Sequence, residues 1–305
     1  MKLALGPILY YWPREKLRAY YEEIATLPVD IVYLGETVCS RRHFMRLPDW
    51  LEVAKMLAAK GKEVVLSSLT LIESESDLKL MRKISENADF AVEANDMGAV
   101  HRLAGRLPFI AGPYLNIYNQ MTLKLIASLG ARRWVMPVEM SLQALQPLQQ
   151  SRPAGLETEV FSYGKLPLAF SSRCFTARFH NLPKDDCRFL CLNDPDGKPI
   201  KTREGKPFLT INGTQTQSAL SYNLIGDLDT LRDSGVNVAR ISPQSEQSET
   251  IIQLFRKCID QQESGKNALR QINDIIPQAS CNGYWHNQPG MEQILPGSDT
   301  GHPRF

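Results

Sequence analysis

The sequence predicts an α/β protein, a (β/α)8 barrel of the TIM-barrel type with a cysteine-bearing insertion after the seventh strand. Two observations predict this fold class. Short apolar runs alternate with helix-like patterns through the first half of the 305 residues. The alternation then stops between about residues 165 and 221, before a last strand and helix. A doubly wound parallel sheet shows the same alternation and is the second candidate.

Eight apolar runs are expected to form the strands, because each is short and is bounded by glycine, proline or polar residues. They cover residues 2–9, 30–34, 63–67, 90–93, 109–111, 133–137, 159–163 and 236–241. The expected helices have apolar residues at helical spacing, such as Leu17, Tyr21 and Ile24 in the first. They cover residues 14–26, 49–60, 75–87, 97–104, 122–129, 142–150 and 249–262.

The chain is expected to form a single domain over residues 1–285. Between about 165 and 221 the helical period gives way to cysteine, arginine, proline and Asp-Gly, followed by a hairpin-like stretch at 206–213. Such an insertion follows the seventh strand at the end of a barrel where functional loops lie. Residues 286–305 are rich in glycine, proline and polar residues and are expected to form a flexible tail.

Composition is ordinary for a globular protein, with 43% hydrophobic and 22% charged residues. The formal net charge of +2 provides no global field toward nucleic acid or an anionic membrane, so no nucleic-acid partner is expected. No apolar run approaches the ~18 residues of a transmembrane helix. The apolar start is interrupted by Pro7 and followed by charged residues, which favours a first strand over a signal peptide. The expected location is therefore cytoplasmic.

Six cysteines in such a chain do not indicate a disulfide scaffold, because nothing signals secretion. Cys174, Cys187 and Cys191 lie close together in polar, irregular sequence, and Cys39 follows the second strand. In a parallel barrel the residues that follow strands share one end, so these four can meet. Clustered thiols favour metal or redox chemistry, and their spacing leaves zinc and an iron–sulfur cluster open. Cys258, within a helix, is expected to be a small buried side chain.

Arginines flank these thiols. Arg41 and Arg42 follow Cys39, and Arg173 and Arg178 surround Cys174. They are expected either to offset the charge of a thiolate cluster and hold an acidic substrate, or to be surface charges paired with the acids at 185 and 186.

Several motifs resemble the U32 peptidase-like family, from the first strand to Trp285. They are Leu-Gly-Pro-Ile-Leu-Tyr-Tyr-Trp-Pro at 5–13, Tyr-Leu-Gly-Glu-Thr-Val-Cys-Ser-Arg-Arg at 33–42, Trp-Val-Met-Pro-Val-Glu at 134–139, Ser-Tyr-Gly-Lys-Leu-Pro-Leu-Ala at 162–169, Ser-Arg-Cys-Phe-Thr-Ala-Arg at 172–178 and Cys-Asn-Gly-Tyr-Trp at 281–285.

The resemblance implies a [4Fe–4S] cluster bound by Cys39, Cys174, Cys187 and Cys191. It also implies a heterodimer with a related protein of the same family, and a role as a hydroxylase subunit in ubiquinone biosynthesis that works without O2. Cys281 is either structural or a substitute ligand. Because no membrane-type amphipathic helix stands out, a lipid-carrier protein is the expected source of an apolar quinone precursor.

Two other functions stay open. A U32-type peptidase would need a nucleophile with a base, or a metal with an open position, and the chain has neither His-Glu-x-x-His nor Gly-x-Ser-x-Gly. A scaffold with a purely structural metal site is the other. No residue is assigned as catalytic. Polar residues at strand ends either line the barrel mouth or close buried hydrogen bonds, and they are Glu36, Glu93, Asn95, Asn116, Glu139 and Glu159.

Overall fold

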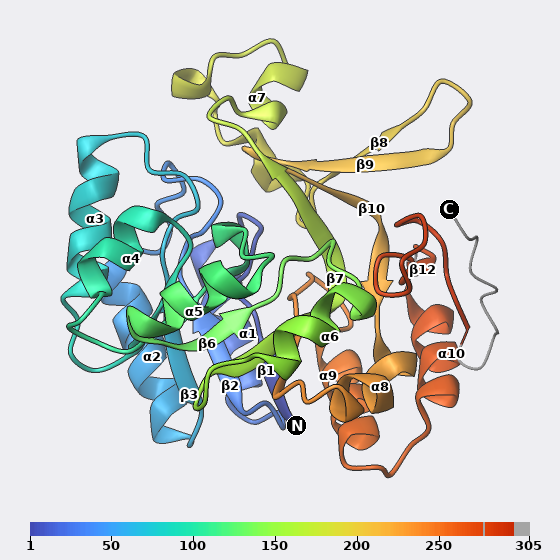
Figure 1. Ribbon diagram of the computed structural model, residues 1–305. Helices are drawn as coiled ribbons and strands as arrows, with labels where there is room; N and C mark the ends of the chain where they lie inside the picture. The colour runs from blue at the N-terminus through green and yellow to red at the C-terminus, as the bar shows by residue number, and fades with distance from the viewer. Residues whose placement is uncertain (277, 296–305) are drawn as a thin grey trace.

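The computed structural model describes residues 1–276 and 278–295, and Figure 1 shows the chain from its N-terminus to its C-terminus. Eight parallel strands close into a barrel, because β11 pairs with both β7 and β1. The strands are β1 (Lys2–Leu5), β2 (Ile31–Leu34), β3 (Glu63–Ser67), β4 (Ala91–Ala94), β5 (Phe109–Ala111), β6 (Ala131–Val135), β7 (Glu157–Phe170) and β11 (Val238–Ile241). The predicted (β/α)8 fold class is confirmed.

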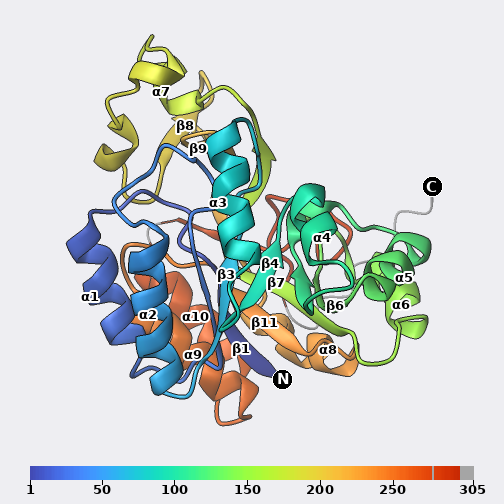
Figure 2. The ribbon, with the colours of Figure 1, turned by 90° about the vertical axis from the view of Figure 1, so that its left-hand side faces the viewer.

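Helices follow the strands and surround the barrel (Figures 1 and 2). They are α1 (Arg14–Ile24), α2 (Leu47–Ala59), α3 (Glu75–Ser85), α4 (Met97–Leu103), α5 (Gln120–Ser128), α6 (Leu142–Gln150), α8 (Leu228–Asp233), α9 (Ser248–Ile259) and α10 (Gly265–Ile275). Short 3-10 turns are η1 (Pro113–Leu115) and η4 (Ile225–Asp227). Most helices turn their apolar faces to the outer surface of the strands, whereas α10 packs on α9 and η4, and this layer is the main hydrophobic core.

The structure differs from the sequence expectations in a few elements. The first strand ends at Leu5 and not at residue 9, because Gly6 and Pro7 follow and proline has no N–H for a sheet hydrogen bond. Helices α8 and α10 were not predicted. In α10 the apolar residues are few, but Ala268, Leu269 and Ile272 share one buried face and Ser264 caps the first turn.

The barrel interior combines a small apolar cluster with buried charges. Ala4, Tyr33, Val65, Ile110 and Val135 belong to the apolar part. Above it, Arg240 forms ion pairs of 2.8 Å with Glu93 and 2.5 Å with Glu159. Side chains therefore fill the barrel, as in other barrels of this class.

Strand β7 does not stop at the rim of the barrel. It continues to Phe170 and pairs there in antiparallel fashion with β10 (Gln215–Asn223), which also pairs with β9 (Pro207–Asn212). The hairpin-like stretch expected at 206–213 is thus β9 and its turn into β10. Strand β8 (Lys198–Lys201) pairs with β9, and Figure 1 shows this β8–β9 hairpin projecting away from the barrel. The chain between β7 and β8 forms α7 (Phe175–Phe179), η2 (Lys184–Asp186) and η3 (Leu190–Asn193).

The segment after α10 returns to the barrel. Strand β12 (Ser280–Cys281) pairs with β10, and His286 Nε2 lies 2.9 Å from the buried Asp227 carboxylate. Ile294 N donates to Asn282 Oδ1 at 2.7 Å. Residues 286–295 of the expected tail are thus hydrogen-bonded to the chain before them, while residues 296–305 lie outside the described residues. Within the described ranges, no helix has the length and apolarity needed to cross a membrane.

Candidate functional site

Four of the six cysteines line one small pocket, although they come from distant parts of the sequence. Cys39 follows β2, Cys174 precedes α7, and Cys187 and Cys191 flank the start of η3. The other residues around this cysteine pocket are Arg41, Arg42, Thr176, Ala177, Phe189, Leu190 and Gly213. In Figure 1, α7 lies beyond the end of the barrel from which β7 emerges. The structure therefore brings together the four cysteines that the sequence singled out.

Cys39 is held by a turn built on Glu36. The Glu36 carboxylate accepts hydrogen bonds from the backbone N–H groups of Val38 and Cys39, at 2.9 and 3.0 Å. Burial raises the pKa of this carboxyl, and Arg42 beside it opposes the increase. Glu36, one of the strand-end residues, thus shapes the loop that positions a thiol.

Cys174 is the N-cap of α7. Its Sγ accepts a hydrogen bond from Ala177 N at 3.4 Å, and Phe175 N donates to the Gly213 carbonyl at 2.7 Å. The first contact places a backbone donor on the sulfur, a type of bond that tunes the potential of cluster thiolates. The second fixes α7 to the turn between β9 and β10.

Cys187 and Cys191 lie on a tight turn. Arg188 and Phe189 between them both have positive φ, 51° and 52°, which non-glycine residues seldom adopt. This conformation lets the two thiols line the same pocket within five residues of chain, Cys187 to Cys191. Backbone strain of this kind is commonly retained at functional sites.

Arg42 is the fully buried cation of the cysteine pocket. Its side chain is 1% exposed and lies 3.6 Å from the Glu36 carboxylate. It donates hydrogen bonds of 2.7 Å to the Leu9 carbonyl and to Asn212 Oδ1. Burial raises the pKa of Cys39 to about 11 and also raises that of Cys191, and the positive charge of Arg42 opposes both increases.

The other three arginines near the cysteines were expected either to lie beside the thiols or to be surface charges, and the structure shows both cases. Arg41 also lines the pocket, and it forms an ion pair of 3.5 Å with the exposed Asp185. Arg173 and Arg178 are exposed and are not among the residues that line the pocket. Asn212, the partner of Arg42, was not found from the sequence, because no local pattern connects two residues 170 positions apart.

The pocket has the thiol ligands that a cluster needs, but it does not have the space for a cluster. Four thiols face it, and the Nε atoms of Arg41 and Arg42 are buried without a hydrogen-bond partner. An anionic group with acceptor sulfurs would satisfy both donors. The free space is only about 10 Å³, so a cluster requires the thiols to move apart.

Over residues 1–276 and 278–295, no group of three or more His, Cys, Asp or Glu side chains is placed to hold a metal ion. The four thiols match a cluster in donor chemistry alone, and side-chain movement must provide the room.

The two remaining cysteines lie elsewhere. Cys258 is buried in α9, as expected. Cys281, in β12, is 1% exposed and packs in the main core, and it does not line the cysteine pocket. Burial raises its pKa to about 12. This placement indicates a structural residue.

Two strand-end acids close a buried ion-pair network in the barrel. Glu93 accepts from Ser67 Oγ at 2.7 Å and pairs with Arg240. Glu159 accepts from Tyr33 Oη at 2.5 Å and pairs with Arg240 as well. With their oxygens engaged, these carboxylates are suited to holding the barrel together rather than to proton transfer.

Comparison with known proteins places the chain in a family. Residues 14–295 match the family model for peptidase family U32, so the chain belongs to this family. The structure of the U32 peptidase Mk0906 is similar with a TM-score of 0.45 and 11% identity, over 80% of this chain and 93% of that one.

Two curated relatives are proteins of Helicobacter pylori, from strains ATCC 700392 / 26695 and J99. Each is named tRNA hydroxylation protein P and is 24% identical over 244 residues. The match covers 73% of this chain and 56% of each relative, so the chain spans little more than half the length of these proteins.

Proposed function

We propose that this U32-family protein binds a [4Fe–4S] cluster through Cys39, Cys174, Cys187 and Cys191 and takes part in a hydroxylation that does not use O2. The observation that carries the proposal is the convergence of these thiols on one pocket beside the buried Arg42. The name of the Helicobacter relatives, which refers to hydroxylation, supports the reaction type.

The proposed pathway is ubiquinone biosynthesis, with this chain as a UbiV-like subunit that pairs with a UbiU-like protein. Support comes from the motifs around Cys39 and Cys174 and from the opening segment at 5–13. A lipid-carrier protein is the proposed source of the quinone precursor. A bound cluster would supply redox or Lewis-acid chemistry. The chain's own contribution is to hold the four thiols, place the Arg42 charge beside them and exclude water.

Metal analysis tests the proposal. Protein purified without air is expected to contain about four irons and four sulfides per chain. Single serine substitutions of the four pocket cysteines should each lower the iron content strongly, while Cys258→Ser should leave it unchanged. Full occupancy by zinc, or iron that survives in the Cys174→Ser variant, would contradict it.

The substrate class needs its own test, because the relatives are named for tRNA. The net charge of +2 favours a small-molecule substrate over a nucleic acid. In a strain lacking this gene and grown without O2, the wild-type chain should restore ubiquinone, and the Cys174→Ser variant should not. Restoration of a hydroxylated tRNA base with no change in ubiquinone would assign the other substrate.

The same variants address the peptidase and scaffold alternatives. A peptidase would cleave peptides from a broad library and lose that activity on a single substitution. A purely structural metal would make Cys174→Ser unfold, whereas a functional cluster predicts a folded, partner-binding but inactive variant.

A further inference from the structure

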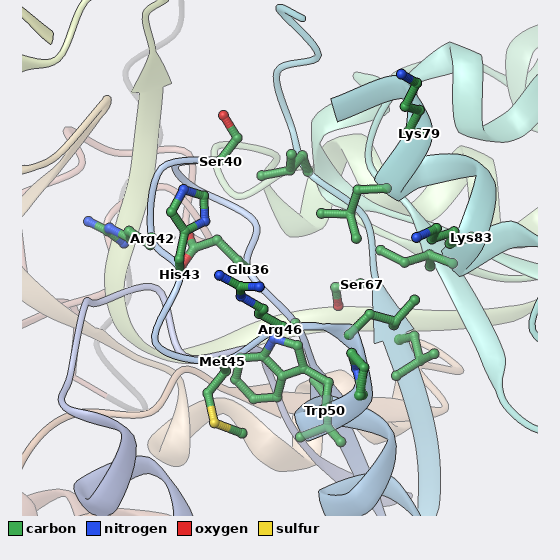
Figure 3. Close-up of a pocket in the computed structure, with 18 of the residues that line it drawn as sticks. Glu36, Ser40, Arg42, His43, Met45, Arg46, Trp50, Ser67, Lys79 and Lys83 are labelled. Carbon is green, nitrogen blue, oxygen red and sulfur yellow. Dashed lines mark ion pairs between the residues drawn. The ribbon is translucent and has the colours of Figure 1, made fainter. Parts of the chain in front are cut away.

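A cavity of about 510 Å³ opens beside the cysteine pocket, between α2 and α3. Its volume lies within the range of small-molecule sites, about 300–1,000 Å³. Figure 3 shows the loop that follows β2 on one side of it and α3 on the other. The family match and the four cysteines do not account for this cavity.

The floor of the cavity is apolar. Leu34 and Leu66 come from the outer face of β2 and β3, and Ile84 comes from α3. Trp50, on α2, is 9% exposed and presents its ring at the base (Figure 3). Such a floor suits an apolar body of one or two rings.

The rim carries cations without acidic partners. Arg46 stands above Trp50, and Lys79 and Lys83 come from α3 on the opposite side (Figure 3). None of these three takes part in an ion pair with a described residue, although other surface cations such as Arg18 and Lys184 do. The one acid among the lining residues, Glu36, is engaged by the Val38 and Cys39 backbone. The rim therefore presents uncompensated positive charge to the cavity.

The cavity shares a wall with the cysteine pocket. Arg42 lines both spaces, while its neighbours Ser40 and His43 face the cavity and Cys39 and Arg41 face the thiols. A molecule in the cavity would be separated from the cysteines only by this one loop.

We infer that this cavity binds a small organic acid, with an apolar ring body over Trp50 and an acidic group held by Arg46, Lys79 and Lys83. Charge-assisted bonds to guanidinium and ammonium groups are the strong interactions available to such an acid. One part of the inference rests on the proposed function, namely that this acid is a reactant at the cysteine site. The binding site itself stands on the cavity and its charges.

A matched pair of ligands tests the site on the full-length chain, purified without air. The probes are 2-naphthoate and its neutral analogue 2-naphthamide, which share shape and differ in charge. Binding can be followed by the change in Trp50 fluorescence, because the other three tryptophans, at 12, 134 and 285, do not line the cavity and contribute a constant signal. The acid should bind at least about tenfold more tightly than the amide.

Variants assign the binding to this cavity. Lys79→Gln combined with Lys83→Gln should weaken 2-naphthoate about tenfold. The control is Arg82→Gln, which removes a positive charge from the same helix at a residue that does not line the cavity, and it should change binding less than about twofold. Trp50→Phe should abolish the fluorescence change while calorimetry still detects binding.

The outcomes separate this inference from the proposed function. Equal affinity for acid and amide, or equal effects of the double variant and Arg82→Gln, would overturn the acid site. The Cys174→Ser variant, which is expected to lose iron, should still bind 2-naphthoate as the wild type does. Absence of iron from the wild-type protein with normal binding of the acid would contradict the cluster and leave the cavity assignment standing.

Discussion

Arg42 donates a 2.7 Å hydrogen bond from Nη2 to Asn212 Oδ1 and thereby joins the loop that carries Cys39 to strand β9. The Gly213 carbonyl in the turn after β9 accepts a hydrogen bond from the Phe175 N–H and so holds α7, whose N-cap is Cys174. One buried side chain thus connects the loop that carries Cys39 with the turn that holds the helix after Cys174.

Substitution of Arg42 should loosen this connection. Arg42→Gln leaves Asn212 Oδ1 without its buried donor and leaves the Leu9 carbonyl with Asn212 Nδ2 alone, and it removes the cation beside the thiols. Because unsatisfied buried groups are unfavourable, we expect the free energy of unfolding to fall by about 2 kcal/mol in urea titrations. The control is Arg173→Gln, at an exposed arginine next to Cys174, which should change stability by less than about 0.5 kcal/mol. Equal effects of the two variants would show that the Arg42 contacts do not stabilise the fold.

A substitution at Gly213 tests the position of the Arg42 side chain, which lies next to this glycine. Its φ is +63°, and a Cβ at this position would lie 2.9 Å from Arg42 Nη2. Gly205 has a similar φ of +79°, but nothing lies within 4 Å of a Cβ there. Both alanine variants share the backbone strain of a left-handed residue, of the order of 1 kcal/mol.

The difference between the two variants therefore isolates the steric contact. Gly213→Ala should be less stable than Gly205→Ala in urea titrations, and it alone should lower the iron content of protein purified without air. If the two variants match in stability and iron content, Arg42 moves aside freely and its position does not matter for the site.

The barrel could be predicted from the sequence because its signal is local. Strand residues such as those at 31–34 and 64–66 are buried on both faces and appear as short continuous apolar runs. Helix α10 was missed because its polar residues outnumber the few apolar positions at 268, 269 and 272, which alone reveal the buried face.

The sequence was enough to predict which cysteines form the site, but not which residues hold those cysteines in place. Cysteines are rare and clustered enough to draw attention, and the rule that loops after parallel strands share one end brought Cys39 to Cys174. The contact from Arg42 to Asn212 depends on how β7, β9 and β10 leave the barrel, which has no signature near residue 42. The cavity over Trp50 was equally hidden, because Arg46, Lys79 and Lys83 are ordinary surface residues until α2 and α3 place them around one space.

The buried thiol of Cys281 should make stability depend on alkaline pH. Burial raises its pKa in the folded protein from the ordinary value of 9.0 to about 12. Below pH 9 both states keep the proton, and above it the unfolded chain loses the proton more readily, so stability falls as pH rises. Between pH 8 and 10 the wild type should lose about 1 kcal/mol more than Cys281→Ala, as measured by urea titration with a reductant present. Parallel curves for the two proteins would mean that the thiol ionises freely in the folded state.

The ion pairs inside the barrel predict a large effect of one acid. Glu159→Gln would keep the shape of the side chain but leave Arg240, which is 4% exposed, with Glu93 as its remaining carboxylate partner. Since removal of one member of a buried charge network leaves the other charge uncompensated, we expect a loss of about 3 kcal/mol in the free energy of unfolding. Glu139→Gln provides the comparison, because Glu139 is exposed and only accepts a hydrogen bond from Tyr118, and its effect should stay within about 0.5 kcal/mol. A Glu159→Gln variant as stable as Glu139→Gln, but defective in the proposed hydroxylation, would instead assign Glu159 to that reaction.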